Sequence, residues 1–326
     1  MKDVALEAGV ALGTVSRVIN GIPVGESYRI KVEEAIKKLN YQVNSYAQGL
    51  KANRTNTIAV LVPNTIHPYF AKLTNCISNA LSKRNYHTLL CCSDYDRSRE
   101  QEYVSMVQKK QVDGIIGLTY NPDLKVDSNT PFVSIDRCLG PGIPCISSDN
   151  FAGGQMAAEK LAELGCRHVA FMRISSSLTN EPNKRKAGFE NGCMICGLTY
   201  ETLLLEDGAN TEDFYRFLDE HYDGERLAFD GIFCGTDVVA YQVHQYLKRL
   251  NIRVPEEVQI IGFDGIRLLS EFGLICSTIV QPVEDIAEMC VEFILQENMT
   301  TKPPLICLPV YYEPGGTTKD SPAGDS

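Results

Sequence analysis

The sequence predicts an α/β protein in which an all-helical N-terminal segment precedes a core of two lobes, each built on a parallel sheet. Three observations support this fold class. Strand-like and helix-like segments alternate over more than 200 residues after residue 56, which is typical of parallel sheets covered by helices on both faces. The strand-like runs are too many for one compact doubly wound sheet. The first 56 residues, by contrast, show only helical patterns.

The N-terminal segment is predicted to form four short helices. The first three cover 2–8, 12–20 and 27–39, and the first two end at Gly9 and Gly21. Ser27 is the expected N-cap of the third helix. A fourth, short helix is expected at 45–51, after a polar stretch.

The core is predicted from two kinds of segment. Apolar strand-like runs lie at 58–63, 87–93, 113–118, 132–136, 145–149, 168–173, 200–206, 231–234, 258–263 and 276–280. Segments with helical spacing lie at about 68–85, 97–110, 151–165, 184–197, 211–221, 237–251 and 283–298. The polar tail at 315–326 is expected to be disordered.

The composition is that of a globular protein outside the membrane. Of the 326 residues, 44% are hydrophobic and 22% are charged, so the chain can bury a sizeable core. The strongest apolar run ends at Pro63, far short of the ~18 residues that span a bilayer. The N-terminus enters a patterned segment at once and shows no signal peptide. We therefore expect a cytoplasmic location.

The twelve cysteines do not predict a disulfide framework, because they are scattered and a cytosolic chain of this size does not need one. Cys193 and Cys196 form a CxxC pair. Without a second pair or a nearby histidine, the pair is better interpreted as buried apolar side chains on a helix than as a zinc or redox site. We expect no metal and no cofactor.

Charge is distributed unevenly along the chain. Residues 1–56 hold eight Lys or Arg and five acidic residues, a net charge of +3, and the whole chain carries −10. The remaining 270 residues therefore carry −13. A basic head on an acidic body indicates a module that faces nucleic acid, since phosphates would repel the body alone.

The first two helices have the pattern of a helix-turn-helix. Such a unit needs a small residue where the helices cross, here Ala5, and a glycine at the turn, here Gly9. Apolar residues must also seal one helix to the other, and these are Val4, Ala8, Val10, Val15 and Val18. The spacing by itself also fits a generic three-helix bundle. In a helix-turn-helix the second helix enters the major groove of DNA.

Ordered motifs along residues 1–314 closely resemble the LacI/GalR family of bacterial transcription regulators. In the helical segment they are Lys2-Asp-Val-Ala, Ala8-Gly-Val, Thr14-Val-Ser-Arg-Val-Ile-Asn20 and Leu39-Asn-Tyr41. In the core they include His67-Pro-Tyr-Phe70, Val112-Asp-Gly-Ile-Ile116, Asp136-Arg137, Ser148-Asp-Asn150 and Ile260-Ile-Gly-Phe-Asp264. The stretches from Asp136 and Asn183 look most like regulators of sucrose or ribose use.

The resemblance implies DNA-contacting residues in the second helix. Leu12, Gly13 and Arg17 match the base-reading positions, and Arg17 can donate two hydrogen bonds to guanine. Leu12 and Gly13 cannot make such bonds, so we expect looser or steric specificity there. Phosphate-contacting positions are matched by Thr14, Ser16, Asn20 and Tyr41. The alternative for each is an ordinary exposed helix residue.

The resemblance also implies a hinge helix at about 44–51 that pairs with its dimer mate in the minor groove. Asn44, Ala47 and Leu50 are its expected DNA contacts, with Leu50 as the side chain that wedges between base pairs. Val43 stands where proline is common in the family, and Gly49 costs a helix about 1 kcal/mol relative to alanine. Our hypothesis is that this hinge helix has low stability.

The core is expected to resemble periplasmic sugar-binding proteins, with a ligand between the lobes at the carboxyl ends of the strands. Sugars need paired carboxylate and guanidinium partners and an aromatic face. The expected ligand residues are Tyr69, Phe70, Asp136, Arg185, Thr236, Asp264 and Gln281. Thr236 departs from the family's more usual asparagine. Aspartates at strand ends also cap helices, which is the alternative role for Asp136 and Asp264.

The predicted domains are a headpiece at 1–56 and a core at 57–314. The first lobe is expected to comprise about 57–152 and 283–309, and the second about 153–280 and 310–314. We expect a homodimer on operator DNA: a repressor of carbohydrate-utilisation genes that leaves a pseudo-palindromic operator when a sugar binds. A purine-type co-repressor would have the opposite effect, because its binding would strengthen the binding of the protein to the operator. An enzyme or a cytosolic sugar-binding protein is disfavoured, because catalytic motifs are absent and the headpiece is basic.

Overall fold

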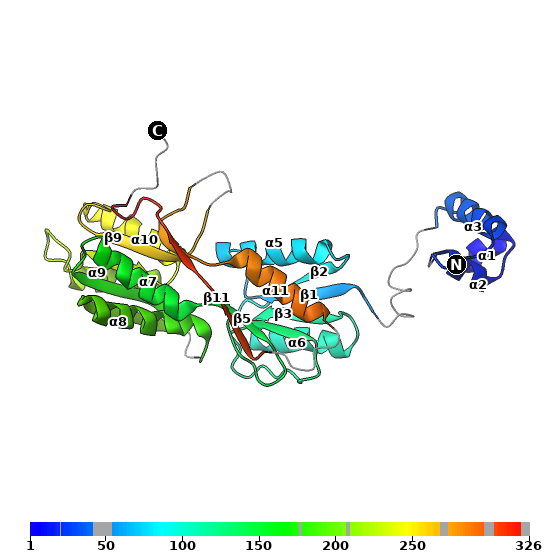
Figure 1. The fold of residues 1–326 in the computed structure, drawn as a ribbon, viewed down its shortest axis with the longest axis horizontal. Helices are drawn as coiled ribbons and strands as arrows, with labels where there is room; N and C mark the ends of the chain where they lie inside the picture. Colours follow the sequence, from blue (N-terminus) through cyan, green and yellow to red (C-terminus); the bar gives the residue numbers. More distant parts are fainter. Residues whose placement is uncertain are drawn as a thin grey trace. The chain divides into compact units, whose positions relative to one another are not determined.

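The computed structural model describes residues 1–19, 21–41, 54–175, 178–206, 209–267, 273–296 and 303–320. The chain divides into two compact units, Met1–Thr55 and Asn56–Ser326. This division falls one residue before the predicted end of the headpiece. Figure 1 shows the helical first unit and the α/β second unit, so the predicted fold class is confirmed.

The headpiece contains α1 (Lys2–Ala8), α2 (Leu12–Ile19) and α3 (Glu26–Lys38). Gly9 ends α1 in the left-handed conformation at φ +62°, which makes the tight turn into α2. The prediction that Ser27 caps α3 is wrong. Gly25 is the N-cap, and its carbonyl accepts from the N–H groups of Tyr28 and Arg29, so Ser27 lies inside the first turn. The helix expected at 45–51 lies outside the described residues.

The first lobe of the core contains a six-stranded parallel sheet in the order β11-β5-β4-β3-β1-β2. Its strands are β1 (Thr57–Val62), β2 (His87–Cys92), β3 (Gly114–Leu118), β4 (Phe132–Ile135), β5 (Cys145–Ser148) and β11 (Leu305–Leu308). Its helices are α5 (Pro68–Ser82), α6 (Arg97–Gln108) and α11 (Val283–Leu295).

The second lobe contains a six-stranded sheet in the order β12-β10-β9-β8-β6-β7. Its strands are β6 (His168–Ser175), β7 (Thr199–Glu206), β8 (Gly231–Cys234), β9 (Gln259–Asp264), β10 (Ser277–Val280) and β12 (Tyr311–Glu313). Its helices are α7 (Asn150–Glu163), α8 (Lys184–Cys196), α9 (Thr211–Glu220) and α10 (Asp237–Arg249). The sheet is parallel except at its edge, where β12 runs antiparallel to β10.

The central strands of both sheets are buried on both faces, which explains their continuous apolar sequences, whereas the edge strands β2 and β7 are partly exposed. In β1, Ile58, Val60 and Val62 pack under α5 and α11, whereas Ala59 and Leu61 face the α6 side. In the second lobe, α7 and α8 cover one face of the sheet and α9 and α10 the other. Figure 1 shows α5 beside α11 in the first lobe and α7 beside α8 in the second.

The chain passes between the lobes at three places. It leaves the first sheet after β5 to enter α7, returns from β10 into α11, and leaves again between β11 and β12. The first crossing lies slightly before the predicted one, because α7 begins at Asn150 and packs on α8. All three crossings bring carboxyl ends of strands to the junction of the lobes, where a ligand site would form.

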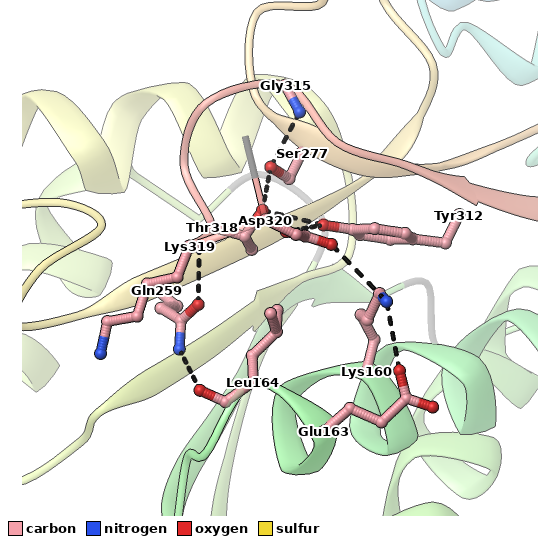
Figure 2. Close-up of polar contacts among 10 residues, drawn as sticks. All are labelled: Lys160, Glu163, Leu164, Gln259, Ser277, Tyr312, Gly315, Thr318, Lys319 and Asp320. Atoms are coloured by element: carbon pink, nitrogen blue, oxygen red, sulfur yellow. Dashed lines mark hydrogen bonds and ion pairs between the residues drawn. The ribbon is translucent and has the colours of Figure 1, made fainter. Parts of the chain in front are cut away.

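The prediction of a disordered tail from residue 315 is wrong for 315–320. This segment lies against the second sheet, and Thr317 and Thr318 are 3% and 1% exposed. Thr318 Oγ1 lies 2.5 Å from the Ser277 hydroxyl and 2.8 Å from the Tyr312 hydroxyl. Figure 2 shows these three side chains together. Gln259 accepts from the Lys319 N–H at 2.9 Å and donates to the Leu164 carbonyl. Polar residues are buried here because each finds a hydrogen-bond partner.

We expect Thr318→Val to destabilise the core by about 2 kcal/mol, because it leaves the buried hydroxyls of Ser277 and Tyr312 without one partner each. Urea unfolding followed by fluorescence measures the change. Lys319→Ala is the matched control, since its side chain is exposed and only its backbone N–H bonds to Gln259. Equal stability of the two variants would contradict a structural role for this segment.

Candidate functional site

The second helix of the headpiece presents the predicted base-reading residues on its free face. Leu12 is 45% exposed, and Gly13 and Arg17 are exposed as well. Val15 points the other way, into a cluster with Val4, Ala8, Val32 and Ala35. The exposed face of α2 is therefore held by packing of its opposite face, as a recognition helix requires.

The structure describes some of the predicted phosphate-contacting residues. Thr14 and Ser16 on α2 are half-buried, and Tyr41 is half-buried against the headpiece cluster. Ala11 precedes α2, and its carbonyl accepts from the N–H groups of Thr14 and Val15 without a side-chain cap. The remaining predicted DNA contacts lie outside the described residues: Asn20, Asn44, Ala47 and Leu50.

Five predicted ligand residues meet at the junction of the two lobes. Tyr69 comes from the first turn of α5, Asp136 follows β4, Asp264 ends β9, Gln281 follows β10, and Arg185 lies in the first turn of α8. Each is at most 8% exposed. Parallel strands bring their carboxyl ends to one edge of a sheet, which is why residues as distant in sequence as Tyr69 and Gln281 converge here.

Gln281 connects the two lobes through its side-chain amide. Its Nε2 donates to Asp264 Oδ1 at 2.7 Å, and its Oε1 accepts from Ser148 Oγ at 2.7 Å. Ser148 ends β5 in the first sheet and Asp264 ends β9 in the second. With both ends of its amide bonded, Gln281 fixes the relative position of these strand ends.

Arg185 is held from three directions. Its Nε donates to Asn150 Oδ1 at 2.7 Å, and its Nη1 donates to the Gly235 carbonyl at 2.5 Å. Its guanidinium lies 3.5 Å from the centre of the Phe263 ring, a cation–π contact. Burial lowers the pKa of Arg185, while the charges of Asp264 and Asp136 oppose that shift. Arg185 is thus a buried cation in a fixed orientation.

Both site aspartates have unusual backbone conformations. Asp136 has φ +62°, in the left-handed region that aspartate tolerates, and Asp264 has φ +137°, a value that non-glycine residues adopt only under constraint. The Asp136 carboxylate accepts from Ser147 Oγ at 2.6 Å, and its carbonyl accepts from the Glu181 N–H across the lobes. Burial raises the pKa of both carboxyl groups. Such strain with raised pKa values is typical of functional sites.

Buried polar atoms at the junction lack partners among the described residues. They include the Tyr69 hydroxyl, Oδ2 of Asp264 and Nδ1 of His67. The electrostatic coupling of Tyr69 with Asp136, Asp264 and Arg185 places it in the same site. Buried polar groups are almost always satisfied, so these atoms indicate a place for a polar ligand.

The remaining two predicted ligand residues have other contacts. The Thr236 hydroxyl accepts from the Val239 N–H at 3.3 Å and caps α10, although the adjacent Gly235 carbonyl binds Arg185. Phe70 is buried in the first-lobe core, with its ring centre 4.9 Å from that of His67 and 5.8 Å from that of Tyr69. Phe70 therefore supports the two neighbouring rings.

The sequence analysis gave no ligand role to several residues of this junction, although Asn150 stands in the Ser148-Asp-Asn150 motif. Asn150 donates to Ser147 and Ser148 and accepts from Arg185, so it links β5 to α8. Arg173 in β6 is buried and donates to the Pro182 carbonyl. The position of Asn150 just after a predicted strand was the feature that could have indicated a role in the site. No pattern marked Arg173, which lies within a strand.

The CxxC pair lies on α8, as predicted for apolar side chains. Cys193 is fully buried among Phe171, Phe189 and Phe233 in the second-lobe core, and Cys196 packs against the same cluster. All twelve cysteines are free thiols. Burial raises the pKa of Cys193 to about 12, which keeps it as an unreactive thiol.

His67 is expected to make stability depend on pH. Burial and the charge of Arg185 lower its pKa from 6.5 to about 4, so between these values only the unfolded chain binds the proton. Stability should therefore fall as the pH drops below 6.5, by about 1–2 kcal/mol from His67 alone by about pH 5. Urea unfolding at about pH 7 and about pH 5 measures this drop in stability. We expect the drop to be smaller in His67→Gln than in the parent.

His168→Gln provides the control for loss of an exposed imidazole outside the junction. Burial raises the pKa of Asp237 to about 6, and this carboxyl acts in the opposite direction. Its contribution is the same in every variant compared. An unchanged pH dependence in His67→Gln would contradict the prediction.

The fold and the two sites define a class: a helix-turn-helix headpiece joined to a two-lobed core of the periplasmic-binding-protein type. Residues 1–44 match the family model of bacterial regulatory proteins of the lacI family. Residues 55–290 match the model of periplasmic binding proteins and the sugar binding domain of the LacI family. The chain belongs to the LacI family of bacterial transcription regulators.

Named relatives and solved structures agree with this assignment. A sucrose operon repressor of Streptococcus mutans is 32% identical, covering 91% of this chain and 92% of the relative. A ribose operon repressor of Halalkalibacterium halodurans is 31% identical, covering 91% and 89%. A LacI-type regulator from Alkaliphilus metalliredigens, solved with D-xylulofuranose, has TM-score 0.69 and 28% identity over 81% of this chain and 99% of that one.

The lac repressor dimer bound to operator has the same fold, with TM-score 0.81 at 22% identity over 97% of this chain and 98% of that one. In the part of the chain that the structure describes, no helix has the length and apolar character to cross a membrane.

Proposed function

We propose that this chain is a cytoplasmic repressor of carbohydrate-utilisation genes whose effector is a sugar bound between the core lobes. The main supporting observation is the buried junction, where Tyr69 Oη and Asp264 Oδ2 have no hydrogen-bond partner among the described residues. Oriented carboxyl, guanidinium and amide groups surround these atoms. Sugars present donors and acceptors that such groups satisfy. The sucrose and ribose operon repressors among the relatives support this assignment.

The proposed ligand residues are Tyr69, Phe70, Asp136, Arg185, Thr236, Asp264 and Gln281. Tyr69, Asp136, Arg185 and Asp264 would bind hydroxyls directly. Gln281 would hold Asp264 in place, and Phe70 and Thr236 would support the first turn of α5 and the start of α10.

On DNA, a homodimer would place two headpieces on the half-sites of a pseudo-palindrome. Leu12, Gly13 and Arg17 would face base edges, and Thr14, Ser16, Asn20 and Tyr41 would contact phosphates. Asn44, Ala47 and Leu50 are the proposed hinge contacts. Sugar binding would change the relation of the lobes and lower DNA affinity, and DNA would lower sugar affinity by the same free energy.

Thermal unfolding of the full chain against free sugars, sugar phosphates and purines tests the effector. A ligand at about 100 times its Kd adds roughly 2.7 kcal/mol to the folded state, which raises Tm by several degrees. A sugar that raises Tm and releases operator DNA in fluorescence anisotropy supports the proposal. A purine that tightens DNA binding would establish co-repression instead. The absence of any shift would contradict the sugar site.

Arg17 is expected to carry sequence recognition in the headpiece. Arg17→Gln should lower affinity for a selected operator by about 10- to 100-fold, because a bidentate guanine contact is worth about 1–3 kcal/mol. Affinity for unrelated DNA should change far less. Anisotropy titrations at one salt concentration measure both. Arg29→Gln, in α3 and paired with Glu26, is the control for loss of one headpiece charge. An equal loss in the two variants would contradict the prediction.

A further inference from the structure

The junction of the lobes contains three arginines that form no ion pair with any described residue. Arg173 is 8% exposed, Arg185 is 4% exposed, and Arg137 is half-buried. Ion pairs within 4.0 Å are formed by other arginines of the described segments but by none of these three. A buried guanidinium without a counter-ion costs folding free energy, so this group of cations requires an explanation.

The side chain of Arg173 is held in place by its surroundings. Its aliphatic part packs over Gly235, and a Cβ added at Gly235 would lie 2.5 Å from Arg173 Cγ, so only glycine fits at position 235. The carbonyl of the same Gly235 binds Arg185. Arg173 Nη1 donates to the Pro182 carbonyl. Arg173 from β6 and Arg185 from α8 therefore both contact Gly235.

Most N–H donors of Arg173 and Arg185 form no hydrogen bond within the described residues. A guanidinium carries five N–H donors. Within the described residues, Arg173 donates one hydrogen bond and Arg185 donates two, all to uncharged oxygens. Burial, and then the charge of Arg185, lowers the pKa of Arg173 to about 10. The two cations therefore repel each other across the site.

The nearby carboxyl groups do not neutralise the pair by direct contact. Asp136 and Asp264 lie beyond 4.0 Å from both arginines and bond instead to Ser147 and Gln281. Glu181 pairs with Lys184 at 2.7 Å. Burial also raises the pKa of Asp136 and Asp264. In the described part of the chain, a ligand anion could therefore bind these guanidinium groups without displacing an ion pair.

A small pocket of the junction adjoins this charge. Its lining includes Tyr120, Asp136 and Arg137 from the first lobe and Asn180 and Pro182 from the second. Arg137 bonds to the carbonyls of Asn121 and Pro122, and Pro182 is the residue whose carbonyl binds Arg173. The pocket is thus lined by Arg137 and by Pro182, the residue to which Arg173 donates its hydrogen bond.

We propose that the effector is an anionic sugar, carrying a phosphate or carboxylate group, and that Arg173 is the residue that selects the anion. This inference rests on the proposed sugar site between the lobes. Arginine binds both anions through paired, charge-assisted hydrogen bonds, and a bound anion would supply the missing counter-ion. A neutral sugar would leave Arg173 uncompensated.

Isothermal titration calorimetry on the full chain tests this with matched ligands: ribose and ribose 5-phosphate, sucrose and sucrose 6-phosphate, glucose and gluconate, and inorganic phosphate alone. We expect one anionic sugar to bind at least about tenfold more tightly than its neutral partner. Arg173→Gln should remove that preference, and Arg173→Lys should keep part of it. Arg167→Gln, an exposed arginine of the same lobe, should keep all of it.

The outcomes separate the two proposals. If a neutral sugar binds as tightly as its anionic partner, the anion inference fails and the sugar site stands. If Arg173→Gln weakens both members of a pair equally, Arg173 has only a structural role and the inference fails. Binding of inorganic phosphate as tightly as any sugar phosphate would also overturn it. If no sugar binds in either form, the proposed function fails as well. Circular dichroism and Tm of each free variant verify folding.

Discussion

Arg185→Gln is expected to weaken effector binding by about 100-fold, because it removes a buried, oriented guanidinium whose charge-assisted bonds to a ligand are worth about 1.5–3 kcal/mol each. DNA affinity of the free protein should stay unchanged, so the variant should remain on its operator at effector concentrations that release the parent. Calorimetry with the effector and anisotropy with labelled operator measure the two effects.

The free variant should stay folded with a modest loss of stability: Asn150 Oδ1 and the Gly235 carbonyl lose their donor, but a buried cation without an ion pair is also removed. Loss of effector affinity in a folded variant with parental DNA affinity distinguishes a binding role from a structural one. Lys186→Gln is the matched control on the same helix, because Lys186 pairs with Glu190 at 2.7 Å away from the junction. Parental effector affinity in Arg185→Gln would remove Arg185 from the site.

Gly188→Ala is expected to have the largest effect on stability. A Cβ at this position would lie 2.0 Å from the Phe151 carbonyl oxygen, and one at Gly154 would lie 2.0 Å from the Arg185 carbonyl oxygen. Helices α7 and α8 therefore touch backbone to backbone, and a methyl group must push them apart. We expect a loss of roughly 3 kcal/mol or more in the free energy of unfolding, measured in urea.

Gly273→Ala is the control for the same change in the same lobe, since a Cβ there meets nothing within 4 Å. It should leave stability nearly unchanged. Because Arg185 lies one helical turn before Gly188, separation of the helices should also weaken effector binding. A Gly188→Ala protein as stable as the Gly273→Ala protein would show that α7 and α8 tolerate separation.

The elements with continuous apolar runs could be predicted from the sequence. The run at 231–234 is β8, with every residue buried, and alternate residues of β1 contact opposite cores. Burial on both faces makes such strands apolar throughout, which a single sequence displays. The two short strands β11 and β12 were not predicted as strands. Their half-exposed positions at sheet edges leave no hydrophobic period to detect.

The candidate site divides in a similar way. Asp136, Asp264 and Gln281 follow strands, and family resemblance singled them out together with Arg185. The bond from Arg185 to Asn150 and the bridge from Ser148 through Gln281 to Asp264 could not be anticipated. These contacts join residues up to 133 positions apart, so they exist only once both sheets have formed and the lobes meet.

The sequence by itself determined the helical headpiece, the alternating core and the membership of the LacI family, because these depend on local periodicity and ordered motifs. Tertiary structure alone decided three matters. Residues 315–320 are ordered because Thr317 and Thr318 find buried partners, whereas composition predicts disorder from polarity. Thr236 caps α10, and Arg173 is a buried cation without an ion pair in the described structure. Partners and burial depend on the surroundings of a side chain, which the folded chain creates.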